Sequence, residues 1–290
     1  MSSSDNTYIQ LEQHFAEWAQ TQSAIRAVIV VGSRARSDHL ADQWSDVDLV
    51  VFTSDAPVYL RDPAWLNTFG TVMIAVPNAF GQHDREWIAL YADGTKLDVA
   101  FLSIDPAATP TLQHMLDVFP YPVVLQRGVR ILVDRTGLSS TLRLPEIDAL
   151  SLPDQAEFTA LTNRMGLDAI KTAKFINRHD LWRAKQVCDS DLKQHLLTLL
   201  EWRAAAQPDQ RDIWYDGRFL SEWADPPAVA ELPATFAAYE VKDLQRALFA
   251  TLDLFQRLAR DVARQLDYAY PSEVDRVVDD HIHSVLQGNL

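Results

Sequence analysis

Short apolar runs separated by polar turns fill the first half of the chain, and they predict β-strands. Runs of about four to eight apolar residues bounded by Gly, Pro or Asp are typical of strands, and a nearly continuous run indicates a strand covered on both faces. Asp93-Gly94 predicts a hairpin turn because glycine tolerates a positive φ, and Pro77 should end the strand that precedes it. The expected strands are residues 25–31, 46–52, 71–76, 87–91, 96–102 and a further one within 123–133, with a break at Arg127-Gly128.

Apolar residues at helical spacing precede and follow this strand region. The expected helices span about residues 8–21, 158–176, 192–203 and 244–266, and the last should end near Pro271. Leu144-Pro145 and Leu152-Pro153 indicate a linker. The pattern therefore predicts an α/β domain of about five strands over residues 1–145 and a helical bundle over residues 146–290, with the cleft between them as the natural ligand site.

Composition adds a charge constraint to this architecture. The 290 residues are 48% hydrophobic and carry a net charge of −14, so the overall field opposes nucleic acid and suits a small polycation. Cys188 is the single cysteine and cannot form an internal disulfide, which fits a reducing cytosol. The first residues lack the pattern of a signal peptide, and no run of about 18 apolar residues is present. We therefore expect a cytoplasmic monomer without a membrane or nucleic-acid partner.

Two aspartates at the entrance of the second strand are the first candidates for chemistry. Side chains alternate along a strand, so Asp46, Asp48, Val50 and Phe52 should share one face. Residues two positions apart on a strand have their Cβ atoms about 6.6 Å apart, so both carboxylates can reach one cation or a pair of cations. Their mutual repulsion makes a divalent metal the simplest counterion, and the sequence predicts a metal site here.

A glycine turn and a third carboxylate extend this candidate site. Gly32 and Ser33 end the first strand, where glycine allows a phosphate to approach the backbone, and Arg34 adds a permanent positive charge. Asp98 lies on a later strand and shares a face with Lys96. Aspartates that hold Mg²⁺ against a triphosphate are suited to phosphoryl or nucleotidyl transfer. Asp98 can complete the metal site or accept the proton of an attacking hydroxyl.

These motifs resemble those of the nucleotidyltransferase superfamily. VGSR, SDVDLVVF and GTKLDVAF are similar to its Gly-Ser turn, its Asp-x-Asp strand and its third-carboxylate strand. The closer resemblance is to the aminoglycoside 6-adenylyltransferases, also called streptomycin adenylyltransferases. It includes FGTVMIAVP at 69–77, the helix around Lys174, Glu201-Trp202 and LDYAYP at 266–271, and so it covers nearly the whole chain.

The resemblance implies a fold, a reaction and a set of site residues. The fold is α+β, with a mixed β-sheet domain and flanking helices followed by a helical bundle. The reaction moves AMP from ATP to a hydroxyl of an aminoglycoside, a small cationic antibiotic, and releases pyrophosphate with the help of Mg²⁺. By position, Asp46 and Asp48 match the metal pair, and Asp98 matches the third carboxylate and general base. The nucleotide contacts implied in the same way are Gly32, Ser33, Arg34, Lys174 and Arg218.

Alternatives remain open from the residues themselves. The acceptor can be another small molecule, a protein hydroxyl or an RNA end, although the acidic balance opposes RNA. A non-catalytic paralogue that only binds nucleotide is the alternative of a different class. The aromatic residues Trp202, Trp214, Tyr215, Phe219 and Trp223 can line a pocket or pack a core. Asp279, Asp280, His281 and His283 complete no metal-ligand spacing and are expected at a solvated helix end or tail.

Overall fold

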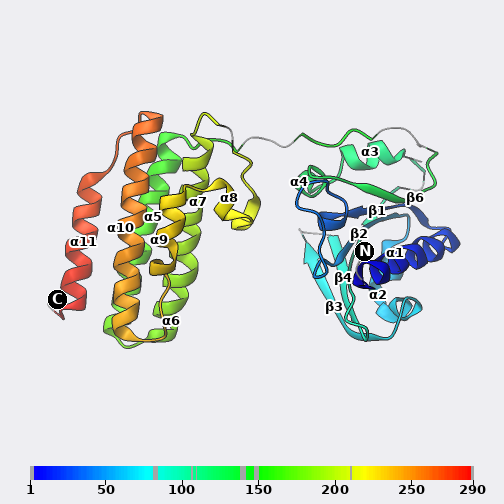
Figure 1. Ribbon diagram of the computed structural model, residues 1–290, viewed down its shortest axis with the longest axis horizontal. Helices are drawn as coiled ribbons and strands as arrows, with labels where there is room; N and C mark the ends of the chain where they lie inside the picture. The colour runs from blue at the N-terminus through cyan, green and yellow to red at the C-terminus, as the bar shows by residue number, and fades with distance from the viewer. Residues whose placement is uncertain are drawn as a thin grey trace. The chain divides into compact units, whose positions relative to one another are not determined.

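The computed structural model divides the chain into two compact units, residues 1–147 and 148–290. It describes residues 3–80, 84–105, 107–108, 110–137, 142–146, 150–209 and 211–288. The first unit holds the β-sheet, and the second is made of helices (Figure 1). Among the described residues, no helix combines the length and the apolar character that crossing a membrane requires.

The first unit is built on a six-stranded mixed sheet with the strand order β3-β4-β5-β2-β1-β6. The strands are β1 (Ile25–Val31), β2 (Val47–Thr53), β3 (Val72–Phe80), β4 (Asp84–Tyr91), β5 (Lys96–Ser103) and β6 (Arg130–Asp134). The central pair β2 and β5 is parallel, and every other neighbouring pair is antiparallel. The predicted hairpin of β4 and β5 and the predicted α+β fold class are confirmed.

The two faces of the sheet bury two separate apolar clusters, as alternation along the strands predicts. On one face Val47, Leu49 and Val51 of β2 pack with Phe15 of helix α1 (Ser3–Thr21). On the other face Val50 and Phe52 pack against α3 (Leu112–Asp117) and α4 (Pro122–Leu125). Figure 1 shows α1 and α3 on opposite sides of the sheet. Asp48 belongs to the face of Val50 and Phe52, at the opposite end of β2 from Phe52.

Two predicted strand features were wrong. Pro77 does not end β3, which continues to Phe80 with Pro77 opposite Trp87. β3 lies at the edge of the sheet, where a proline is tolerated because its missing N–H need not serve a second neighbouring strand. The segment 123–133 is only half strand, because Pro122 starts the helical turn α4 and β6 begins at Arg130. Proline has a preset φ that suits the first helical position.

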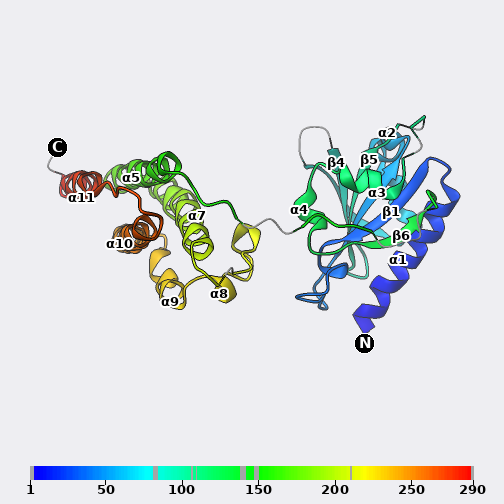
Figure 2. The same ribbon diagram turned by 90° about the horizontal axis from the view of Figure 1, so that it is seen from above.

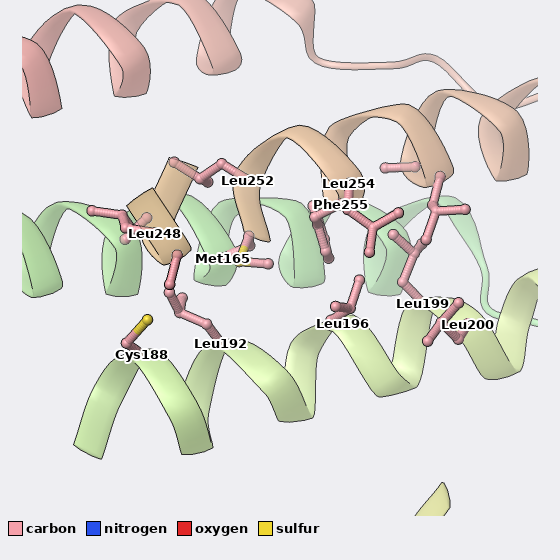
Figure 3. Close-up of a cluster of buried hydrophobic side chains, with 14 of the residues drawn as sticks. Met165, Cys188, Leu192, Leu196, Leu199, Leu200, Leu248, Leu252, Leu254 and Phe255 are labelled. Atoms are coloured by element: carbon pink, nitrogen blue, oxygen red, sulfur yellow. The ribbon is translucent and has the colours of Figure 1, made fainter. Parts of the chain in front are cut away.

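The second unit is a bundle around three long helices, α5 (Gln155–Asn177), α7 (Leu192–Ala205) and α10 (Val241–Leu266) (Figure 2). Figure 3 shows leucines of α7 and α10 turned toward each other, with Met165 of α5 among them. Asp154 caps α5 with a reciprocal capping box to Glu157. The other helical elements include α6 (Leu181–Gln186), the π-helical turn Val187–Asp191, α8 (Leu220–Trp223), α9 (Pro226–Thr235) and α11 (Ser272–Leu286).

Helix α11 carries the polar residues expected at a solvated helix end, and Asp280 and His283 are exposed on it. Val278, Ile282 and Val285 are buried on one side of it, facing the bundle core. Gly166 of α5 allows this approach, because a Cβ there would lie 2.8 Å from Cγ2 of Val278. The polar residues around Asp280 lie on the other side of this amphipathic helix, and the sequence analysis did not identify its buried side.

Candidate active site

The turn after β1 is shaped by its contact with β2. Val31 lies opposite Asp48 in the antiparallel pair, so the chain turns at Gly32 directly beside the Asp48 side chain. Gly32 has φ 67°, a left-handed conformation that other residues rarely adopt. A Cβ at this position would overlap Oδ2 of Asp48. Glycine is therefore required here for two reasons, the backbone conformation and the close approach of a carboxylate.

The sheet brings the three predicted carboxylates together. Asp48 and Asp98 are register partners on the parallel strands β2 and β5, and Asp46 lies immediately before β2. One carboxylate oxygen from each of Asp46, Asp48 and Asp98 lies within 4.8 Å of the other two. Because alternation puts the three side chains on one face, they converge at the entrance of the two strands.

Burial and mutual repulsion shift the protonation of these carboxylates. Burial raises the pKa of Asp48 to about 7, and the negative charges of Asp46 and Asp98 contribute to the rise. Burial likewise raises the pKa of Asp98, while its hydrogen bond from Lys96 opposes the rise. Crowded carboxylates that resist ionisation are typical of sites that bind a cation.

The residues present fit a hard divalent cation such as Mg²⁺. All three candidate ligands are carboxylates, and oxygen ligands are those that Mg²⁺ prefers. Oδ1 of Asp98 is buried and has no hydrogen-bond partner among the described residues. A buried carboxylate oxygen without a partner is costly, and a bound cation would satisfy it.

Lys96 is a site residue that the sequence interpretation did not single out. Its Nζ donates to Oδ2 of Asp46 at 2.6 Å and to Oδ2 of Asp98 at 2.8 Å. Partial burial disfavours the charged ammonium, but the two hydrogen bonds outweigh it and raise the pKa of Lys96. The signal was available in the spacing, because a residue two positions before Asp98 shares its strand face.

Ser33 and Arg34 lie at the turn, but their side chains differ in what they contact. Oγ of Ser33 is buried without a hydrogen-bond partner among the described residues. The Arg34 guanidinium donates to the backbone carbonyls of Asp46 at 3.1 Å and Ser45 at 3.0 Å, and it lies 4.0 Å above the Tyr8 ring. Arg34 thus fixes the segment that presents Asp46, and its contact with a phosphate stays a prediction.

Lys174 and Arg218 belong to the helical unit, so their contact with a nucleotide at the three carboxylates also stays a prediction. Lys174 is exposed near the end of α5. Arg218 is exposed, and its Nη1 donates to the Tyr215 hydroxyl at 3.2 Å. Of the nearby aromatic residues, Trp214 and Trp223 are buried in the bundle, which favours core packing for those two over a pocket lining.

A mixed sheet that gathers three carboxylates beside a Gly-Ser turn is suited to nucleotidyl transfer, and the relatives of the chain support its assignment as a nucleotidyltransferase. The chain belongs to the streptomycin adenylyltransferase family, whose model matches residues 7–285. The resemblance carried by the Gly-Ser turn, the Asp-x-Asp strand and the third-carboxylate strand is therefore confirmed at the level of the family.

Similar proteins include several aminoglycoside 6-adenylyltransferases. That of Bacillus subtilis (strain 168) is 23% identical over 267 residues, which cover 89% of this chain and 90% of the relative. That of Staphylococcus aureus is 22% identical over 267 residues, which cover 89% and 91%. A crystal structure of an aminoglycoside 6-adenyltransferase from Bacillus subtilis aligns with 98% of this chain and 99% of its own, at 18% identity and a TM-score of 0.44.

Proposed function

We propose that this protein transfers AMP from ATP to a hydroxyl of an aminoglycoside, with streptomycin as the expected acceptor, and releases pyrophosphate. The observation that carries the proposal is the convergence of Asp46, Asp48 and Asp98 oxygens within 4.8 Å beside the Gly32 turn. Membership of the streptomycin adenylyltransferase family supports the reaction class. The names of the relatives support an aminoglycoside as the acceptor.

The three aspartates have distinct tasks in this proposal. Asp46 and Asp48 hold Mg²⁺, and Asp98 completes the metal site or takes the proton from the acceptor hydroxyl. Bound Mg²⁺ would neutralise the charge that develops on the phosphate oxygens. Burial raises the pKa of Asp98, which strengthens it as a proton acceptor relative to an exposed aspartate.

The nucleotide contacts follow from the turn and from two basic residues. The resemblance assigns phosphate contacts to Gly32 and Ser33, and the Ser33 hydroxyl, which has no hydrogen-bond partner among the described residues, is a candidate donor. Lys174 and Arg218 supply positive charge to the triphosphate from the helical unit. The net charge of −14 suits a polycationic acceptor.

Pyrophosphate release with ATP, Mg²⁺ and a panel of aminoglycosides tests the proposal directly. We expect release that depends on streptomycin, and a product whose mass has increased by one AMP. Asp48→Asn should lower the rate by at least about a hundredfold, because loss of a metal ligand removes several kcal/mol of transition-state stabilisation. Asp253→Asn, at an aspartate 79% exposed on α10, is the matched control and should leave the rate unchanged.

Three other results would contradict the proposal, and each identifies an alternative. Pyrophosphate release that depends on a small molecule other than an aminoglycoside would mean that the protein transfers AMP to a different acceptor. A mass increase on a co-incubated protein, with the antibiotics unchanged, would indicate a protein hydroxyl as the acceptor. ATP binding by calorimetry without turnover for any acceptor would indicate a non-catalytic nucleotide-binding protein.

A further inference from the structure

Lys96 occupies the space between two of the three candidate metal ligands. Its ammonium is within 2.8 Å of one oxygen on each of Asp46 and Asp98, and both of these carboxylates belong to the group that could hold a metal. Bonds this short between an ammonium and carboxylates are charge-assisted and strong. The positive charge that balances Asp46 and Asp98 therefore comes from the chain itself.

The sheet fixes the base of this side chain. Lys96 is the first residue of β5 and is paired with Leu90 of β4. Its backbone N–H donates to the Tyr8 hydroxyl at 3.4 Å, and Tyr8 also lies beneath the Arg34 guanidinium. The backbone is held on both sides, but the four-carbon stem is flexible and the side chain is 39% exposed. The ammonium is thus free to leave the carboxylates while the backbone stays in place.

A divalent cation and this ammonium compete for the same oxygens. Mg²⁺ binds carboxylate oxygens at about 2.0–2.1 Å in a strict octahedral geometry, and it would repel a nearby ammonium. We propose that Lys96 is an internal counterion of Asp46 and Asp98 that a divalent cation must displace, so that Lys96 weakens the affinity of the site for metal. This inference rests on the metal site of the proposed function.

Calorimetric titration of the metal-free chain with Mn²⁺ tests this inference without any turnover. Mn²⁺ is a suitable probe because it shares the preference of Mg²⁺ for oxygen ligands. Lys96→Gln should bind Mn²⁺ at least about tenfold more tightly than the unaltered chain, because the competing charge is gone. Lys96→Arg retains the charge and should bind with nearly the original affinity. Lys242→Gln, at an exposed lysine of α10, makes the same change of charge elsewhere and should also leave the affinity unchanged.

Asp48→Asn separates failure of this inference from failure of the proposed metal site. If Mn²⁺ binding is lost in Asp48→Asn but is no tighter in Lys96→Gln, the Lys96 inference is overturned and the metal site stands. If neither the unaltered chain nor any variant binds Mn²⁺, the Lys96 inference and the proposed metal site are both overturned.

Thermal unfolding supplies a second readout that controls for folding. In EDTA, Lys96→Gln should melt below the unaltered chain, because Asp46 and Asp98 lose their counterion. Added Mn²⁺ should raise its Tm more than it raises that of the unaltered chain, since a ligand at a given concentration stabilises the folded state more when its Kd is lower. An equal rise in both proteins would contradict competition between Lys96 and the metal.

Discussion

At the scale of single residues, Gly32 lies beside Asp48 and leaves the space that the Asp48 carboxylate fills. The register of β1 and β2 places the turn beside the aspartate, and a Cβ at position 32 would require the Asp48 carboxylate to move. This contact helps to bury the carboxylate and so contributes to its resistance to ionisation. Asp48 is thus held in a state that favours a proton or a cation as partner.

The raised pKa of Asp48 predicts a pH-dependent effect of Asp48→Asn on stability. The pKa is about 7 in the folded, metal-free chain against an ordinary value of 3.8 for aspartate, so between these pH values the folded state holds a proton that the unfolded state has released. Stability is therefore lost as pH rises through this window. Asn mimics the protonated form and removes the loss, so the variant should gain up to about 2 kcal/mol more over the unaltered chain at pH 8 than at pH 5. Urea unfolding in EDTA measures the difference.

Asp253→Asn is the control for this pH experiment, because Asp253 is 79% exposed and far along the sequence on α10. Its effect on unfolding should be the same at both pH values. A gain for Asp48→Asn that is equal at pH 5 and pH 8 would mean that burial does not hold a proton on Asp48.

At the scale of elements, the sequence predicted what period-two alternation controls and missed what depends on neighbours in space. The two faces of β2 and the meeting of Asp48 with Asp98 follow from alternation once β2 and β5 are paired. Pro77 was misread because its tolerance depends on β3 being an edge strand, which only the strand order reveals. The contact of Lys96 with Asp46 and those of Arg34 with the backbone of Ser45 and Asp46 were harder to predict, because they join residues that are far apart in the sequence.

The buried side of helix α11 leads to a prediction about the bundle. Ile282 is fully buried between α11 and the rest of the helical unit, so Ile282→Ala should lower the free energy of unfolding by about 2–5 kcal/mol through lost burial and a residual cavity. Val277 lies on the same helix and is 52% exposed, and Val277→Ala is the matched control with an expected change below about 0.5 kcal/mol. Urea unfolding followed by circular dichroism measures both, and an equally small effect of the two substitutions would show that α11 adds little to the bundle.

At the scale of the whole molecule, the two units divide the work that the proposed function requires. The sheet unit contains all three carboxylates together with the Gly32 turn and Lys96, so it has the parts needed for metal and phosphate chemistry. The helical unit has its own apolar core and contributes the basic candidates Lys174 and Arg218. The acidic charge is a property of the entire chain, and it favours a cationic acceptor whichever unit binds it.

The net charge of −14 predicts opposite salt effects on the two proposed substrates. Salt shortens the Debye length from about 10 Å at 0.1 M to about 3 Å at 1 M, which screens attraction of the cationic aminoglycoside and repulsion of anionic ATP alike. The KM for the aminoglycoside should therefore rise several-fold between 0.05 and about 0.5 M KCl, whereas the KM for ATP should stay level or fall. Initial rates of pyrophosphate release give both constants, and sucrose at equal osmolality should change neither. A KM for ATP that rises by the same factor as that for the acceptor would mean that salt acts on the fold or on local contacts such as those proposed for Lys174 and Arg218, and the acidic balance would then have no part in selecting a polycation.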